Sequence, residues 1–453
     1  MVWLMYCNAV GGAYGLEDSI GGGGALLTII FVILIPVVWS LPTALVVTEL
    51  STSIPTNAGF LMWVNCAFHP IAYIVLAMHT ILLVLIDNAI YPVLFSTYVC
   101  TLTTCSVWQE RALRVALLLV TMALNIVGIE VVGWLSVLVT VIMLSPFFLM
   151  CGISLGKSGG YLNWPAIAAI PSEISWTSFI PTVSWNLSGL EQAGSVAEEV
   201  ADPQRTIIKV MFPLLILAWL TYIPPVLVGM SQSHDPTVDF GQWTTGYWST
   251  IANDVGGPGF KAFLVAGGAV SAFGLTLSMI CVTSRNLNGI AETGVFPTVV
   301  SNVLCRIHHK FRTPHWTIII NTVLTGLFAT FGTFGMLVKI DQFLYGIRVV
   351  MIFLAAIRLR YRYPTLHRPF RVPLSNDRLV LFLFLPLVYS LGLMTISMLT
   401  SVETFVMSMG SVVVGTVLAS VYYWFWRREG FDGTIVVAEE EEASAAGQLR
   451  GNS

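Results

Sequence analysis

A short glycine-rich stretch near the start of the chain, Gly11-Gly12-Ala13-Tyr14-Gly15, carries residue types that could bind a small solute. It follows the apolar run 2–10. Three glycines in five residues disfavour a continuous helix, and inside a bilayer a broken helix is tolerated only where it is buried in protein or lines a water-filled cavity. We therefore expect an unwound point in a first membrane helix, with backbone N–H and C=O groups facing a substrate. The alternative is a tight loop between a short anchor and the next helix.

A second interruption lies in the middle of the chain. After the apolar and aromatic run 178–185 comes the small and polar segment 186–195, with Glu191 in its middle. Because burying a carboxylate in a membrane is costly, an acid there is a functional candidate. Two breaks about five helices apart are typical of an inverted repeat that holds substrate at the bilayer midplane between them. The alternative is that Gly189 and Gly194 only allow close helix packing.

Acids and aromatic residues of these spans could bind cationic groups. A solute with an ammonium at each end and no carboxylate requires separated carboxylates and aromatic faces for cation–π contact in a medium of low dielectric constant. Glu191 and Asp87 are the expected carboxylates. The expected aromatic walls or gates are Trp185 and Tyr345, and Tyr14 is expected to close over the site. The alternatives are a hydrogen bond within its own helix for Asp87 and plain packing for the aromatic residues.

An α-amino acid is the alternative substrate. Its carboxylate needs N–H donors, which the Gly11–Gly15 backbone and the N-terminus of a half-helix would supply. Its amine needs carbonyl groups from both breaks. Arg348 follows Tyr345 by three residues and therefore shares a helix face with it. Arg348 either reaches the site and helps to hold an anion or pairs with an acid such as Asp341.

Uphill transport needs a co-transported ion, which would be a proton or sodium. The hydroxyl groups of Thr283 and Ser284 either contribute oxygens to a sodium site or simply cap their helix. Glu191 or Asp87 is the candidate proton carrier, because a buried carboxylate can take up a proton. No cofactor and no metal are expected.

Composition places the chain among polytopic membrane proteins. Of its 453 residues, 56% are hydrophobic and only 10% are charged, whereas a soluble domain carries about 25% charged residues. The seven cysteines lack the spacing of a zinc or redox site. Cys100 and Cys105 either pair across one expected outer loop or stay free thiols. No His cluster, phosphate loop or nucleophile motif stands out, so we expect neither an enzyme nor a protein that binds nucleic acid.

Twelve apolar segments approach the length of about 20 residues that a membrane helix needs. We expect an all-α membrane protein with a five-plus-five inverted repeat, broken helices 1 and 6, and two further C-terminal helices. A single transporter domain would span 1–426, with repeats over about 1–155 and 177–362 and the last two helices over about 379–426. The acidic segment 427–453 is expected to be a disordered tail. The expected spans are about 2–24, 25–50, 68–98, 112–128, 131–155, 177–200, 206–230, 260–284, 316–336, 340–358, 379–400 and 404–426.

Basic residues are unevenly distributed between the two sides of this arrangement. The positive-inside rule places the richer side, and with it both termini, in the cytoplasm, and the plasma membrane is the expected location. The poorer side carries Arg111, Arg114, Lys157, Lys261 and Lys339. The richer side carries Arg205, Lys209, Arg285, Arg306, Lys310, Arg312, Arg358, Arg360, Arg362, Arg368, Arg371, Arg378, Arg427 and Arg428.

Several motifs extend over nearly the whole chain. They are Gly11 to Asp18, Trp39-Ser40-Leu41-Pro42, Asp87 to Phe95, Trp185-Asn186-Leu187 with Glu191, Ser284-Arg285, Phe343-Leu344-Tyr345 and Arg368-Pro369-Phe370. In this combination the chain resembles transporters of the amino acid–polyamine–organocation superfamily, most closely the plant and protozoan polyamine transporter branch. The resemblance implies a secondary transporter that imports polyamines by alternating access, with the proton as the co-transported ion and the bilayer as its setting.

Three departures from the polyamine branch weaken the case for a polycation. Its members often carry a glutamate just before the first-helix glycines, where this chain has Asn8. They often carry acids in the eighth helix, where 273–277 is neutral, and a glutamate in the tenth, where Ile352 stands. A permease for cationic or neutral amino acids is therefore the alternative function. A nutrient-sensing receptor on the same scaffold is a further alternative, although such receptors usually carry long cytoplasmic tails, and the short tail here favours transport.

Overall fold

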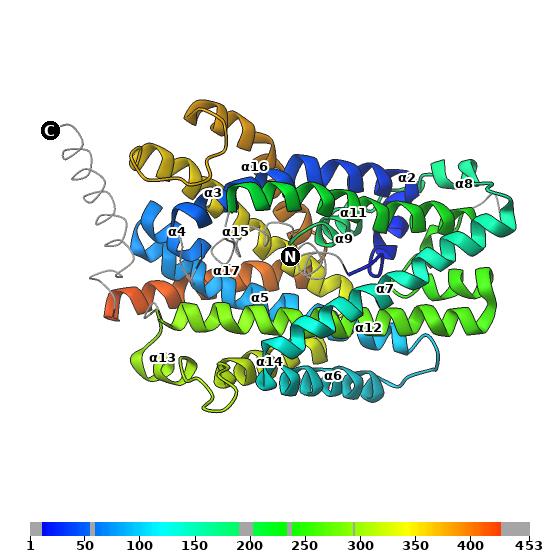
Figure 1. Ribbon diagram of the computed structural model, residues 1–453, viewed down its shortest axis with the longest axis horizontal. Helices are drawn as coiled ribbons and strands as arrows, with labels where there is room; N and C mark the ends of the chain where they lie inside the picture. Colours follow the sequence, from blue (N-terminus) through cyan, green and yellow to red (C-terminus); the bar gives the residue numbers. More distant parts are fainter. Residues whose placement is uncertain (1–10, 55–58, 190–202, 233–237, 293–294, 427–453) are drawn as a thin grey trace.

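The protein is a bundle of long helices. The computed structural model describes residues 11–54, 59–189, 203–232, 238–292 and 295–426, and every regular element in these ranges is helical. Eight helices of the described part are long and apolar enough to cross a membrane. Shorter and more polar helices, such as α14 and α6, lie alongside them (Figure 1). The expected all-α membrane fold is confirmed.

The elements follow the expected spans closely. From the first described helix to α9 they are α2 (Glu17–Ile35), η1 (Pro36–Ser40), α3 (Leu41–Ser53), α4 (Phe60–Ala67), α5 (Pro70–Val99), α6 (Val107–Val127), α7 (Ile129–Ser158), α8 (Trp164–Ala168) and α9 (Trp176–Asn186). The remaining elements are α11 (Pro203–Ser231), η3 (Phe240–Gln242), α12 (Trp248–Glu292), α13 (Thr298–Leu304), α14 (His315–Phe331), α15 (Phe334–Arg362), α16 (Asn376–Met398) and α17 (Val402–Trp426).

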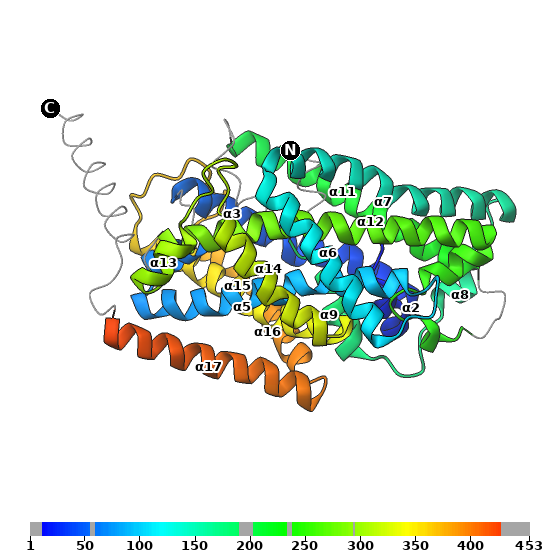
Figure 2. The same ribbon diagram turned by 90° about the horizontal axis from the view of Figure 1, so that it is seen from below.

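The centre of the bundle is formed by α5, α12 and α15. Helix α12 packs against α5 and α7, and α15 packs against α5, α9 and α16. The last two helices lie on the outside, where α17 runs along α5 at the edge of the bundle (Figure 2). Residues of α5, α9, α12 and α15 are therefore the ones that can meet in the interior.

The first two spans are separated by a sharp turn at Gly24. Its φ of 79° and ψ of 166° interrupt α2, which confirms the expected boundary between residues 24 and 25. Only glycine adopts this conformation readily. A Cβ at Gly24 would also lie 2.8 Å from the carbonyl oxygen of Ala169. Helix α2 thus consists of a short helix that follows the first break and a longer one that continues through the π-helical turn η1 into α3.

The interval between the expected spans 206–230 and 260–284 contains a helix that those spans did not include. A helix begins at Trp248 and is interrupted only at Gly257, where φ is 75°, before α12 continues. Its buried apolar residues are Trp248, Ile251, Ala252 and Val255, which recur at the spacing of one helical face. Because the opposite face is polar, the mean hydropathy of this segment is too low to indicate a buried helix. The regular spacing of its apolar residues does indicate one.

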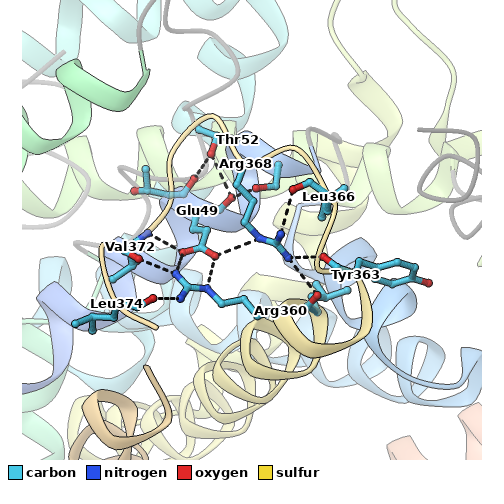
Figure 3. Close-up of polar contacts among 11 residues, drawn as sticks. Glu49, Thr52, Arg360, Tyr363, Leu366, Arg368, Val372 and Leu374 are labelled. Atoms are coloured by element: carbon cyan, nitrogen blue, oxygen red, sulfur yellow. Dashed lines mark hydrogen bonds and ion pairs between the residues drawn. The ribbon is translucent and has the colours of Figure 1, made fainter. Parts of the chain in front are cut away.

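One buried carboxylate ties the end of α3 to the end of α15. Glu49 accepts hydrogen bonds from Arg360 Nε at 2.7 Å and Nη2 at 2.5 Å, and from the backbone N–H of Val372 at 2.8 Å (Figure 3). Arg368 Nε lies 3.5 Å from the same carboxylate. Arg360 also donates to the carbonyls of Val372 and Leu374. This network fixes the segment 363–375 across the end of the bundle.

The loop between α5 and α6 is closed by a disulfide. Cys100 and Cys105 form a disulfide, with their Cα atoms 5.5 Å apart. Of the two alternatives for these cysteines, a pair or free thiols, the structure therefore shows the pair. In the adjoining helix, Arg114 donates to the carbonyls of Ala329 at 2.8 Å and Gly332 at 3.1 Å. A cation at the C-terminus of α14 satisfies carbonyls that have no partner within the helix. Residue Arg114 therefore serves packing at this end of the bundle.

Candidate functional site

The glycine-rich stretch that precedes α2 is non-helical, as expected. Residues 11–16 form turns, and Gly12 and Gly15 have φ angles of 79° and 85°. Its carbonyl groups accept hydrogen bonds from other elements: Ser271 Oγ donates to Gly11 at 2.6 Å, and Trp248 Nε1 donates to Ala13 at 2.8 Å. These bonds hold the unwound segment against α12. Whether its remaining backbone groups face a solute stays a prediction.

The second break begins where expected. Helix α9 ends at Asn186, and Gly189 has a φ of 88°. The side-chain amide of Asn186 donates to the backbone carbonyl of Gly15 at 3.4 Å, and the backbone carbonyl of Asn186 accepts from Tyr222 Oη at 2.8 Å. The two breaks are thus in direct contact. Glu191 and the rest of the interruption lie outside the described residues.

Tyr14 lies inside the protein rather than at the edge of an open site. It is 2% exposed, and its hydroxyl donates to the carbonyl of Leu264 at 3.0 Å. Its ring contacts Tyr98 and Phe147, with centroids 5.0 and 4.7 Å away. In this conformation Tyr14 joins the break to α5, α7 and α12.

Asp87 and Trp185 come together through Tyr91. The Tyr91 hydroxyl donates to Asp87 Oδ1 at 3.1 Å, and the Tyr91 and Trp185 rings lie 6.1 Å apart. Trp185 also lies beside the first break, because a Cβ at Gly15 would approach its ring to 3.1 Å. The absence of a side chain at Gly15 makes room for this tryptophan. Leu275 completes the group as an apolar neighbour of Tyr91 and Trp185.

A second acid, Asp341 of α15, belongs to the same region. It is 3% exposed, and its Oδ2 accepts from Gln342 Nε2 at 2.9 Å. Its Oδ1 has no hydrogen-bond partner among the described residues. Asp87 and Asp341 interact electrostatically with each other and with Tyr91. A buried carboxylate oxygen without a partner is costly, and two neighbouring acids repel. A cation between them would relieve both effects.

Tyr345 lies between a tryptophan and an arginine. The guanidinium of Arg348 is 4.6 Å from the centroid of the Tyr345 ring and 5.4 Å from that of Phe60, and Trp39 meets Tyr345 edge to face at 5.5 Å. The positive charge of Arg348 also acts on Asp341. Arg348 thus stacks on Tyr345 and offsets part of the charge of Asp341, which agrees with the second of the two roles considered. Its role in holding an anion stays a prediction.

Thr283 and Ser284 lie in a cluster of amides and hydroxyls. Asn88 Nδ2 donates to Thr283 Oγ1 at 3.0 Å, and Asn321 Nδ2 donates to Thr283 at 2.9 Å and to Ser284 at 3.1 Å. This cluster does not include the α12 hydroxyl that contacts the first break. That hydroxyl belongs to Ser271, which lies 12 residues before Thr283 and about 18 Å from it along a straight helix. The described residues hold no group of three or more His, Cys, Asp or Glu side chains suited to a metal ion.

Sequence comparison agrees with this architecture. Residues 2–425 match the family model described as amino acid permease, and the chain therefore belongs to the amino acid permease family. It is 32% identical to polyamine transporter PUT1 of Oryza sativa subsp. japonica, over 92% of this chain and 76% of that protein. It is 31% identical to polyamine transporter RMV1 of Arabidopsis thaliana, over 92% and 83%.

A solved structure shares the fold. The nucleobase-cation-symport-1 family transporter Mhp1, in a closed conformation with bromovinylhydantoin bound, aligns over 98% of this chain and 95% of its own, with a TM-score of 0.57 and 13% sequence identity. The fold is thus the inverted-repeat architecture in which breaks in two helices meet inside the membrane. Family and fold together define a multi-pass membrane transporter and not an enzyme.

Proposed function

We propose that this protein imports polyamines of the putrescine and spermidine class by alternating access, with protons as the coupling ion. The observation that carries the proposal is the pair of acids Asp87 and Asp341, of which the second has a buried oxygen with no hydrogen-bond partner in the part of the chain that the structure describes. The names of its relatives, which are polyamine transporters, support the same substrate class.

The surroundings of the acids match the other parts of a diamine. Ammonium groups are attracted both to carboxylates and to the faces of aromatic rings, and Tyr91 and Trp185 lie beside Asp87. A methylene chain needs apolar neighbours, which Leu275 provides next to both rings. Glu191, on the second break, is proposed as a further carboxylate, and the Gly11–Gly15 backbone as the opposite wall.

The orientation in the membrane is proposed from the charges at the two ends. The end that holds Arg360 and Arg368 is assigned to the cytoplasm by the positive-inside rule. The disulfide between Cys100 and Cys105 then lies on the outer side, where disulfides persist. The plasma membrane is the proposed location.

An amino acid is the second candidate substrate, and Arg348 is the residue that favours it. Its guanidinium stacks on Tyr345 and acts on Asp341, so a positive charge already lies near the proposed ammonium site. A small shift of this side chain would place it where a carboxylate of an α-amino acid could be held.

Uptake by purified protein in proteoliposomes distinguishes the two substrates. We expect radiolabelled putrescine to accumulate when the medium is more acidic than the lumen, and to be displaced by spermidine but not by L-leucine or L-arginine. A proton ionophore at constant sodium should abolish accumulation. Displacement by the amino acids, with no displacement by spermidine, would replace the polyamine proposal with the amino acid one.

A further inference from the structure

A lid covers the first break from the side of the α11–α12 connection. We define the lid as residues 238–256, which comprise η3 and the helix that begins at Trp248 and ends at the interruption of α12 at Gly257. Trp248 is fully buried and donates to the carbonyl of Ala13. A Cβ at Gly21 would lie 2.5 Å from the carbonyl oxygen of Trp243. The lid backbone therefore lies directly on the helix that follows the break.

A single carboxylate connects the lid, the break and α5. Glu17, the first residue of α2, is 0% exposed. Its Oε2 accepts a hydrogen bond from the backbone N–H of Gly15 at 2.7 Å, and its Oε1 accepts from the backbone N–H of Gly246 in the lid at 3.0 Å. The hydroxyl of Tyr98 in α5 donates to the same Oε1. No lysine, arginine or histidine is among its recorded partners in the described residues.

The three partners of Glu17 respond differently to a proton on its carboxylate. A protonated carboxyl presents an O–H donor, and a backbone N–H cannot become an acceptor. The Tyr98 hydroxyl can rotate and accept. The least costly protonated state therefore carries its proton on Oε1 with Tyr98 as acceptor. The N–H of Gly246 then meets a neutral hydroxyl oxygen in place of a carboxylate oxygen, so its bond to Glu17 loses charge assistance and is weakened. The N–H of Gly15 keeps a carbonyl acceptor in Oε2.

We propose that Glu17 is a proton-binding latch: its carboxylate holds the lid closed over the break, and protonation releases the lid. This inference deepens the proposed proton coupling and rests on it, but it does not depend on the substrate. Release would expose the buried face of the lid, including Trp243, Trp248 and Ser249. Gly257, with its φ of 75° and no heavy atom within 4 Å of a Cβ built on it, is the hinge.

Other titratable groups lie around the latch. Asp18, the next residue of α2, accepts from Thr245 Oγ1 at 3.2 Å and interacts with Lys339 of α15. Tyr14 of the break and Tyr98 of α5 interact with the charge of Glu17. Asp18 also bonds to the lid, through both the side chain and the backbone of Thr245, but unlike Glu17 it interacts with a cation, Lys339. Asp18 is therefore the control for an acid that bonds to the lid and has a cation nearby.

The test follows the accessibility of the lid in the purified full-length protein, held in lipid nanodiscs so that a soluble reagent reaches both faces. Ser249→Cys places a thiol at a lid position that is 2% exposed. Its labelling by a maleimide is measured from pH 8 to pH 5 and divided, at each pH, by the labelling of the same protein unfolded in detergent. This division removes the pH dependence of the thiol itself.

If Glu17 is the latch, the normalised labelling rate should rise about tenfold for each unit by which the pH falls above the midpoint, because opening then requires one proton. Adding Glu17→Gln, which imitates the protonated acid, should give fast labelling at every pH. Adding Asp18→Asn should keep the tenfold change per pH unit, because the proton still binds at Glu17, although removal of the neighbouring Asp18 charge shifts the midpoint. Labelling that is independent of pH with Glu17 intact would overturn the inference, as would Glu17→Gln protein that labels as slowly as its parent at pH 8.

The labelling assay contains no substrate, so its result is separate from that of the uptake assay. A pH-dependent lid in a protein that does not transport putrescine would leave the latch standing and remove the proposed substrate. Proton-driven putrescine uptake together with lid labelling that does not change with pH would overturn the latch and leave the proposed substrate standing. The pH dependence with Glu17 intact requires no substitution at this position, so the inference remains testable even if Glu17→Gln protein fails to fold.

Discussion

Glu49 and Asp341 are both acids buried in membrane helices, but their surroundings differ. Glu49 meets Arg360, Arg368 and the N–H of Val372, so both of its oxygens are used. Asp341 accepts from the amide of Gln342 with one oxygen, and its other oxygen has no hydrogen-bond partner within the described ranges. The described residues thus satisfy both oxygens of Glu49 but only one oxygen of Asp341, and the neighbouring Asp87 adds repulsion.

The contrast separates a structural acid from a ligand-binding one. Removing one member of a complete buried ion pair leaves charges stranded, so the fold loses stability. Removing an acid that forms no ion pair with a cation of the described residues costs the fold less, and the loss appears in ligand binding. Substitution of Glu49 should therefore lower the stability of the fold, whereas substitution of Asp341 should weaken ligand binding and leave stability nearly unchanged.

The largest effect is expected for Glu49→Gln. It strands the Arg360 and Arg368 guanidinium groups in a buried site, which should lower the free energy of unfolding by about 3–5 kcal/mol. Thermal unfolding of the detergent-solubilised protein measures this loss. Thr52→Ala, one turn further on, removes a hydroxyl that bonds only to its own helix and should change stability by less than about 1 kcal/mol. Equal stability of the Glu49→Gln and parent proteins would contradict the structural role assigned to Glu49.

A smaller effect is expected for Trp185→Leu. Loss of one cation–π contact should weaken putrescine binding by about 0.5–2 kcal/mol, a factor of roughly 2 to 30. Because the ring would attract any ammonium group, monoamines should weaken by a similar factor. Isothermal titration of both ligands measures it. Phe334→Leu is the matched control, since Phe334 packs edge to face on Trp185; an equal loss in this variant would assign Trp185 to packing.

The parts of the site that follow from local sequence were predictable. The three glycines at 11, 12 and 15 broke the helical pattern, and two of them have positive φ. Asp87 was conspicuous as an acid within an apolar run, and its hydrogen bond to Tyr91, one turn away, is the local partner considered as an alternative. The break after Asn186 was marked by its own small and polar residues.

The parts that depend on packing were not predictable. Asp341 was considered only as a partner for Arg348, because the sequence does not show that α15 turns this side chain toward Asp87. The available signal was that Asp341 is the single acid of α15 and stands next to the polar Gln342. Glu17 was attributed to a family motif, since its bonds to Tyr98 and Gly246 join residues 81 and 229 positions away.

The central claim is that Asp341 holds one end of a diamine, and isothermal titration of putrescine against pentylamine tests it most directly. The two ligands have the same number of heavy atoms, but only putrescine carries a second ammonium. The parent protein should bind putrescine more tightly by about 1.5–3 kcal/mol, roughly 10- to 100-fold. Asp341→Asn should remove most of this preference without lowering the unfolding temperature. Putrescine binding of parental strength in Asp341→Asn, or an equal loss for both amines, would contradict the account.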